Sequence, residues 1–295
     1  MGVIAAVTKT AFLKRKISLV LRCHAIRGPD ARNGPNDYTD LMIHIKNEHE
    51  IEKMRSACAS ASRVLDKLGK MLRPGISTAE VDKAAKEMIS EEGCKSAFFG
   101  YRNFPGQVCI SVNEEVVHGI GGSRRIQYGD VVSLDVGVIK NGWVGDTAKT
   151  VPIGAVRNDW MRLLAVTEDV LDRVIPMATA GRRLGDLCSF IEDEIVANGY
   201  NVVREFVGHG VGRNLHEEPQ VPNFGRPGTG PKLKAGMTIA IEPMVNLGTA
   251  NVRTLGDDWT VVTADGQPSA HFEHTILITK EQPEILTWRE KLQSK

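Results

Sequence analysis

The sequence predicts one α+β domain in which helices cover a central, curved antiparallel sheet. The first observation behind this prediction is a β-hairpin. Residues 131–153 (VVSLDVGVIKNGWVGDTAKTVPI) place apolar strands on both sides of Asn141-Gly142, a dipeptide that favours a tight hairpin turn. The second observation is a repeat, because a helix–helix–strand layout occurs twice at an offset of 106 residues. Together they predict duplicated helix–helix–hairpin units around the sheet, related by a pseudo-twofold axis.

Two helices are predicted ahead of the hairpin. Residues 48–72 carry apolar side chains at helical spacing, which is the pattern of an amphipathic helix. Ser77 and Glu80 form a capping box that begins a second helix. Gly93 marks the end of that helix, since glycine commonly follows a helix C-terminus.

The same elements return in the second half of the chain. Gly75 corresponds to Gly181 at the offset of 106 residues. Further matched positions are Val64 with Val170, Leu65 with Leu171, Met71 with Met177, Val81 with Leu187, Ile89 with Ile195 and Gly93 with Gly199. With one inserted residue, Asp135 aligns with Glu242. A pseudo-twofold axis would bring these two acids together at the centre of the sheet.

The predicted hairpin places two aspartates on one face. With a two-residue turn, residue 135 pairs with 148 and residue 137 with 146, so Asp135 and Asp146 become diagonal neighbours about 7–8 Å apart. Two carboxylates at that spacing can share a pair of metal ions about 3.5–4 Å apart. The alternatives are a bulge that changes the register, or two solvated acids on an exposed face.

Three more side chains of the metal-ligand type follow. His209 lies between glycines in FVGHGVG, Glu242 precedes a proline in TIAIEPMV, and Glu273 precedes an apolar strand in SAHFEHTILI. Each has an ordinary structural interpretation on its own. Four carboxylates and one imidazole together favour a two-metal site for Mn, Fe, Co or Zn.

Composition excludes several classes of protein. A net charge of +1 argues against binding nucleic acid through bulk charge, and no apolar run is long enough to span a membrane. The cysteines are odd in number and lack C-x-x-C spacing, which favours a reducing, cytoplasmic compartment and no thiolate metal site. They are Cys23, Cys58, Cys94, Cys109 and Cys188.

Residues 1–46 are predicted to be an N-terminal extension to a catalytic domain of residues 47–295. Residues 1–29 contain no acid, and Lys14-Arg15-Lys16 precedes a short apolar stretch. A loosely ordered cytosolic extension is one interpretation. The others are organelle targeting, a partner-binding tail and a misassigned start.

The chain resembles the type I methionine aminopeptidases, which have the pita-bread metallopeptidase fold. The resemblance covers residues 47–288. The segments that carry it are NFPGQVCISVNEEVVHGI, VSLDVGVIKNGWVGDT, VVREFVGHGVGRNLHEEPQV, KAGMTIAIEPMVN, DDWTVVT and HFEHTILIT.

The resemblance implies five metal ligands for two divalent ions (Co, Mn, Fe or Zn). Asp146 and Glu273 would bridge both ions, Asp135 would complete one side, and His209 and Glu242 would complete the other. A water between two such ions is a nucleophile at neutral pH.

Three residues would handle the substrate directly. His118 and His216 fall on the family's two noncoordinating active-site histidines. His216 would polarise the scissile carbonyl, and His118 would hydrogen-bond the peptide nitrogen. Glu242 would also pass a proton to the leaving amine. Outside the resemblance, each histidine could simply hold a loop.

The family's methionine pocket maps onto residues with aromatic rings, one thiol and one aliphatic side chain, which suit a thioether. They are Tyr101, Phe104, Cys109, Leu215 and Trp259. Leu215 departs from the Phe found in many relatives, and Gly137 varies too. Phe104 and Trp259 have an alternative role as ordinary core residues.

The implied activity is removal of N-terminal methionine from nascent proteins when the second residue is small. The resemblance also implies a monomer that works near the ribosome, without a membrane or nucleic-acid partner. Two rivals remain. An X-Pro aminopeptidase or prolidase is disfavoured because only 46 residues precede the first shared helix. A catalytically dead binding module is disfavoured because every ligand position is filled.

Overall fold

A computed structural model describes residues 43–288 of the chain, and most of the predicted extension, residues 1–42, lies outside the described residues. The helical elements within this range are α1 (Glu48–Met71), α2 (Thr78–Glu91), η1 (Tyr101–Asn103), α3 (Asn158–Val174), η2 (Ile175–Met177) and α4 (Leu184–Ala197). The strands are β1 (Lys95–Ser96), β2 (Cys109–Val112), β3 (Glu115–Val117), β4 (Val131–Lys140), β5 (Trp143–Pro152), β6 (Asn201–Val202), β7 (Gly208–Gly210), β8 (Glu217–Val221), β9 (Thr238–Ile241), β10 (Met244–Asn246), β11 (Val252–Thr254), β12 (Val261–Thr263), β13 (Ser269–His271), β14 (His274–Leu277) and β15 (Glu284–Ile285). No helix in this range is both long and apolar enough to cross a membrane.

The predicted helices and their repeat are confirmed. Asn47 caps α1, and Ser77 caps α2 through the expected box with Glu80. Helix α4 begins and ends 106 residues after α2, which is the offset found in the sequence. The predicted α+β class is therefore confirmed, with two helix pairs flanking the strands.

The β4–β5 hairpin has the predicted register. Lys140 pairs with Trp143, and Gly137 pairs with Asp146. Asn141 and its neighbouring glycine adopt φ angles of 52° and 78°, as a two-residue turn with both central residues left-handed requires. Asp135 and Asp146 consequently lie on one face of the hairpin.

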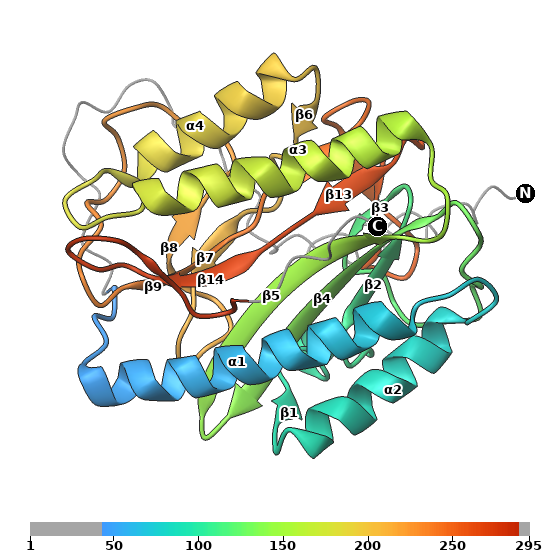
Figure 1. The fold of residues 1–295 in the computed structure, drawn as a ribbon, viewed down its shortest axis with the longest axis horizontal. Helices are drawn as coiled ribbons and strands as arrows, with labels where there is room; N and C mark the ends of the chain where they lie inside the picture. The colour runs from blue at the N-terminus through green and yellow to red at the C-terminus, as the bar shows by residue number, and fades with distance from the viewer. Residues whose placement is uncertain (1–42, 289–295) are drawn as a thin grey trace, which may run out of the picture. The chain divides into compact units, whose positions relative to one another are not determined.

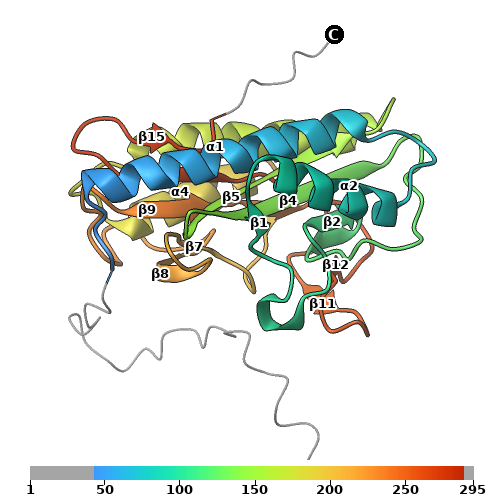
Figure 2. The same cartoon turned by 90° about the horizontal axis from the view of Figure 1, so that it is seen from below.

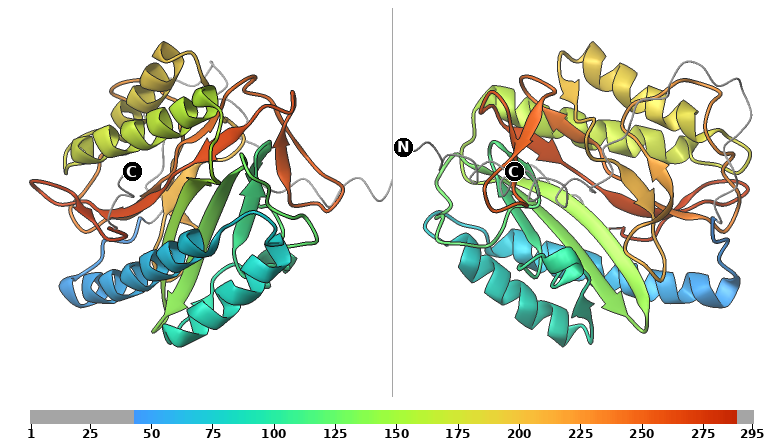
Figure 3. Two further views of the ribbon diagram at one scale, coloured as in Figure 1. Left: turned by 45° about the vertical axis from the view of Figure 1, so that its right-hand side comes forward. Right: turned by 180° about the vertical axis from the view of Figure 1, so that it is seen from behind.

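The second half of the chain builds a matching but interrupted hairpin. Strands β9 and β10 pair with β14 and β13, and the register continues across the break because Ile241 faces His274 and Met244 faces His271. The break on one strand falls at Glu242. Figure 3 shows this second hairpin beside the first. The two are joined directly, since the Thr150 hydroxyl donates to the His271 carbonyl at 3.0 Å.

The helices form one layer over the strands. Figure 1 shows α1 and α2 along one side and α3 and α4 along the other, with β4, β5 and β14 between them. Figure 2 shows α1 above β4, β5 and β9. Two apolar clusters fill the space between the layers, one joining α1 and α2 to β4 and the other joining α3 and α4 to β9 and β14. The opposite face of the strands is therefore left for a functional site.

Helix α1 approaches β5 so closely that one position tolerates no side chain. A Cβ on Gly145 would lie 2.5 Å from the backbone carbonyl carbon of Ala57. Backbone atoms on both elements would have to separate to admit it, because interiors are packed without spare volume. Gly145 is next to Asp146, so this contact also helps to fix the position of the Asp146 backbone.

We expect Gly145→Ala to lower the free energy of unfolding by about 1–3 kcal/mol, the usual cost of overpacking. Gly256→Ala is the matched control, because Gly256 is exposed and a Cβ there meets nothing within 4 Å. Its effect should stay within about 0.5 kcal/mol. Urea unfolding measures both, and equal stabilities for the two variants would contradict the close approach of α1.

Candidate metal centre

The four predicted acidic ligands lie where the two hairpins meet. Asp135 and Asp146 come from β4 and β5, while Glu242 and Glu273 occupy the two breaks in the second hairpin. The backbone N–H of Glu273 donates to the Ala148 carbonyl of β5 at 2.9 Å. The duplicated units thus bring their acids to one place, as the repeat predicted.

The predicted imidazole joins these acids. Ligand atoms of Asp146, His209 and Glu273 all lie within 4.8 Å of one another. Nε2 of His209 is 3.8 Å from a carboxylate oxygen of Asp146 and 3.5 Å from one of Glu242. Asp135 lies on the same face of the hairpin as Asp146, because residue 135 pairs with 148 and residue 137 with 146. All five side chains named from the sequence therefore converge.

His209 is oriented by its own strand. Its Nδ1 donates to the carbonyl oxygen of Gly210 at 2.9 Å, so the lone pair of Nε2 faces the carboxylates, as a metal-binding histidine requires. The glycines on either side are needed for the close packing of β7. A Cβ on Gly208 would lie 2.4 Å from the Ala240 carbonyl oxygen, and one on Gly210 would lie 2.2 Å from the carbonyl oxygen of Glu218.

The electrostatics of the centre favour a bound cation. Burial raises the pKa of Asp135 to about 7, against an opposing effect of His271. Burial and the charge of Asp135 hold the pKa of Asp146 well above its usual range. The Oδ1 atoms of both aspartates are buried and make no hydrogen bond. A divalent cation would satisfy these oxygens and favour their ionised form, so the donor set fits a metal site.

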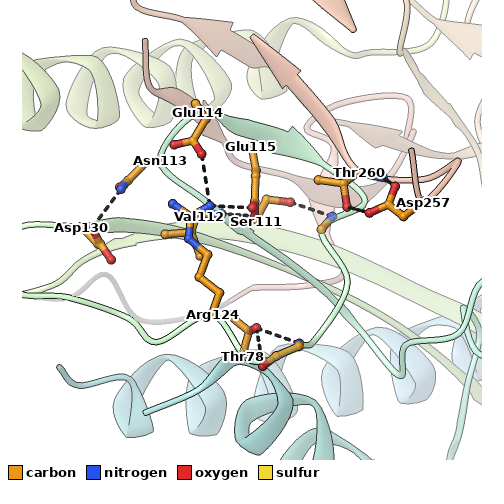
Figure 4. Close-up of polar contacts among 12 residues, drawn as sticks. Thr78, Ser111, Val112, Asn113, Glu114, Glu115, Arg124, Asp130, Asp257 and Thr260 are labelled. Atoms are coloured by element: carbon orange, nitrogen blue, oxygen red, sulfur yellow. Dashed lines mark hydrogen bonds and ion pairs between the residues drawn. The ribbon is translucent and has the colours of Figure 1, made fainter. Parts of the chain in front are cut away.

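His118 lies at the edge of this centre on a tightly held turn. Its φ of 61° is left-handed, a conformation that surrounding contacts must maintain in a non-glycine residue. The Ser111 hydroxyl accepts the N–H of Gly119 at 3.1 Å. Glu115 accepts a backbone N–H of β2 at 2.8 Å and pairs with Arg124 at 2.6 Å (Figure 4). These bonds fix both ends of the turn.

His216 meets the imidazole of the centre, His209, edge to face. Its ring centroid is 4.3 Å from that of His209, and its Nδ1 forms a 2.8 Å hydrogen bond with the hydroxyl of Tyr101. The His216 residue is exposed, yet the partial desolvation of its ring, followed by the charge of His209, lowers its pKa to about 3. Burial lowers the pKa of His118 to about 4. Both imidazoles are therefore neutral at pH 7 and can exchange hydrogen bonds with an uncharged peptide group.

The five predicted pocket residues come together beside the acids. Phe104, Cys109 and Leu215 belong to one buried apolar cluster, against which Tyr101 and Trp259 pack. The rings of Phe104 and Trp259 meet edge to face with centroids 5.1 Å apart. Burial and the charge of the neighbouring Asp135 raise the pKa of the Cys109 thiol well above its usual value, so this side chain is an uncharged, polarisable surface.

Comparison with known proteins settles the family. The model described as "Metallopeptidase family M24" matches residues 52–280. The chain belongs to metallopeptidase family M24. The pita-bread fold and the resemblance to methionine aminopeptidases are thereby confirmed, and family membership implies metal ions.

Individual relatives agree with this membership. A methionine aminopeptidase from Clostridium perfringens is 49% identical over 246 residues, which is 83% of this chain and 99% of that protein. The crystal structure of methionine aminopeptidase from Thermotoga maritima matches with a TM-score of 0.83 at 45% identity, covering 84% of this chain and 100% of that one. A prolidase from Pyrococcus furiosus shares the M24 fold with a TM-score of 0.69 at 24% identity, covering 85% of this chain and 67% of that one.

The structure adds side chains to the M24 site that the sequence analysis missed. His271 is buried, and its Nε2 lies 3.4 Å from a carboxylate oxygen of Glu242. The sequence could have indicated His271, because it lies two residues before Glu273 and side chains two apart in a strand point to the same face. Phe98 covers Gly137, where a Cβ would lie 2.4 Å from the ring. No local sequence pattern predicts the contact between Phe98 and Gly137.

We expect Mn²⁺ to stabilise the wild-type protein by about 2.7 kcal/mol when its free concentration is 100 times the dissociation constant. Asp146→Asn should lose this stabilisation, since it removes a buried anionic ligand. The metal-free variant should melt at a higher temperature than the metal-free wild type, because one of several crowded like charges is gone. Thermal unfolding with a chelator and then with Mn²⁺ measures both effects.

Asp82→Asn is the matched control for that experiment. Asp82 is a partly buried carboxylate outside the site that accepts the N–H groups of Gln107 and Val108 at 2.6 and 3.3 Å. This variant should keep the full Mn²⁺ shift. A shift retained by Asp146→Asn, or absent from the wild type, would contradict the metal centre.

Proposed function

We propose that this chain is a methionine aminopeptidase, which hydrolyses the first peptide bond of chains that begin with methionine and have a small second residue. One observation carries the proposal: an apolar cluster that contains Cys109 and aromatic rings borders an acidic centre that fits metal ions. The two methionine aminopeptidases named above match along nearly their whole length.

The proposed cofactors are two divalent ions, drawn from Co, Mn, Fe and Zn. Asp146 and Glu273 would contact both ions, Asp135 would complete one coordination sphere, and His209 and Glu242 would complete the other. When bound, such a pair lowers the pKa of a water molecule and polarises a carbonyl group. The buried Oδ1 atoms of the two aspartates support this assignment, because a cation would compensate them.

Glu242 is the proposed proton carrier. The Nδ2 of Asn223 donates to its backbone carbonyl at 3.0 Å, and the following Pro243 restricts the chain. Its carboxylate lies within 3.5 Å of nitrogen atoms of His209 and His271. Held in this way, the carboxylate would accept a proton from the attacking water and deliver it to the leaving amine.

The two neutral imidazoles would hold the substrate's first peptide bond. We assign His216 to the scissile carbonyl oxygen and His118 to the peptide nitrogen. His118 also lies against Trp259, with ring centroids 6.0 Å apart, so it stands between the pocket and the acidic centre. A side chain in the pocket would thus place the following peptide group beside both histidines.

Methionine fits this pocket for chemical reasons. An unbranched thioether bends to fill an irregular space and makes favourable contacts with aromatic ring edges. Phe104, Trp259 and the Cys109 thiol offer such surfaces. A β-branched or cyclic first residue would lack the reach to use them.

Nascent polypeptides are the proposed physiological substrates, and the cytoplasm the proposed compartment. We also propose a monomer that meets its substrates near the ribosome, as the family resemblance implies. The domain bounds, with residues 1–46 as an extension and 47–295 as the catalytic domain, likewise remain a proposal.

A direct test is release of the first amino acid from Met-Ala-Ser, Leu-Ala-Ser and Pro-Ala-Ser by purified protein supplied with Mn²⁺ or Co²⁺. We expect free methionine from the first peptide and far slower cleavage of the other two. A preference for Pro-Ala-Ser would support the X-Pro aminopeptidase alternative instead. Absence of cleavage and of bound metal would support the non-catalytic alternative.

Glu242→Ala belongs in the same experiment. It should lose about 10²–10⁴-fold in rate, as expected for removal of a general base, and metal content is measured in parallel. Glu281→Ala, in an exposed loop, is the control that should keep wild-type activity. Near-wild-type turnover by Glu242→Ala with full metal loading would contradict the role of this carboxylate.

A further inference from the structure

A buried lysine precedes the first helix. Lys46 is 5% exposed, and its Nζ lies 2.9 Å from a carboxylate oxygen of Glu217. Its backbone N–H donates to the Gly236 carbonyl at 2.8 Å, which fixes the segment ahead of α1 against the loop before β9. The two charged groups are 171 positions apart in the chain, so this ion pair is a tertiary contact.

Glu217 in turn holds the connection between β7 and β8, residues 211–216. Its other carboxylate oxygen accepts the N–H of Asn214 at 3.1 Å. The connection folds tightly over this carboxylate, because a Cβ on Gly212 would lie 2.5 Å from one of its oxygens. Burial alone would raise the pKa of Glu217, but the hydrogen bond and charge of Lys46, together with backbone N–H donors such as that of Asn214, outweigh it and lower that pKa.

The same connection carries two residues assigned to the substrate. Leu215 lines the proposed methionine pocket, and His216 stands over the metal centre immediately before Glu217. The connection has a second anchor on β5. The N–H of Val144 donates to the Gly212 carbonyl at 2.8 Å, and the Arg213 guanidinium lies 4.6 Å from the Trp143 ring centroid. On the side next to Leu215 and His216, Glu217 holds the connection together with the hydrogen bond between Tyr101 and His216.

We propose that Lys46 is a positioning residue: by neutralising Glu217 it holds the 211–216 connection, and with it Leu215 and His216, in the arrangement that binds substrate. The inference rests on the proposed function for the roles of those two residues. It assigns to the segment ahead of α1 a direct influence on the active site.

The energetics of ion pairs predict different effects for the single and the double variants. Removing one partner leaves an uncompensated buried charge, whereas removing both charges together costs far less. In Lys46→Met, the partly buried Glu217 carboxylate would lose its counter-charge and turn further toward water, which would weaken its hold on the connection. In the double variant Lys46→Met/Glu217→Gln no charge remains to be hydrated, so the connection should stay closed.

Steady-state kinetics with Met-Ala-Ser test the proposal. We expect Lys46→Met to raise KM and to lower kcat/KM by about 10-fold, the scale of a modest loss of binding. The double variant and Lys46→Arg should both recover most of the loss. A purely structural role would reduce the amount of folded enzyme and so lower apparent kcat without changing KM.

Lys149→Met is the matched control. Lys149 also has a buried side chain, and its Nζ lies 2.7 Å from a carboxylate oxygen of Asp66 on α1, away from the substrate side. This variant should lose stability but keep the wild-type KM. Equal KM values for Lys46→Met and Lys149→Met, or a double variant as impaired as Lys46→Met, would overturn the proposal.

A second readout does not depend on activity. Arg213 is exposed on the connection, so trypsin cleavage after it, followed by mass spectrometry, reports opening of residues 211–216. Cleavage should be faster in Lys46→Met than in wild type, Lys149→Met or the double variant, and equal rates would overturn the proposal. If the wild type releases no methionine, the proposed function fails, while this measurement still decides whether Lys46 holds the connection.

Discussion

The whole arrangement depends on the crowding of carboxylates that are largely shielded from water. Asp135 and Asp146 project from β4 and β5, Glu242 and Glu273 enter from the two breaks of the second hairpin, and one imidazole, that of His209, joins them. Carboxylates in such surroundings repel one another and lose hydration, and a bound cation compensates both effects while keeping them ionised. The packing of the two hairpins and their helices therefore holds the carboxylates close together although they repel one another.

The duplicated units explain how the chain brings these carboxylates together. Each unit places a helix pair on the outside and a hairpin on the inside, and each hairpin contributes two of the acids. The first hairpin is regular because its acids project from continuous strands. The second is interrupted at Glu242-Pro243 and before β14, so its acids enter the centre at breaks. Hydroxyl groups such as that of Thr150 then bind one hairpin to the other.

Local patterns predicted the elements and much of the site. Asn141-Gly142 defined the turn, and the turn fixed the register that put Asp135 and Asp146 on one face. The offset of 106 residues located α4 from α2 to the residue. These predictions succeeded because turn geometry and strand period are properties of short segments. The repeat helped as well, because the second half of the chain has the same order of helices and strands as the first.

Contacts between distant segments were not predicted. The ring of Phe98 over Gly137 arises from how two segments meet, and no period or spacing encodes it. The same holds for Lys46 and Glu217, whose pairing depends on the path of the chain ahead of α1. His271 is an intermediate case, since its alternation with Glu273 placed it on the active face but its partner, Glu242, came from the other strand. Specificity and positioning rest largely on such tertiary contacts.

The central claim is that the buried acids exist to hold two cations side by side. Anomalous diffraction from a crystal grown with Mn²⁺ tests it most directly. The account predicts two manganese peaks, with oxygens of Asp146 and Glu273 reaching both and the remaining ligands divided between them. A map with no peak among these five side chains, or with a single ion bound elsewhere, would contradict the account.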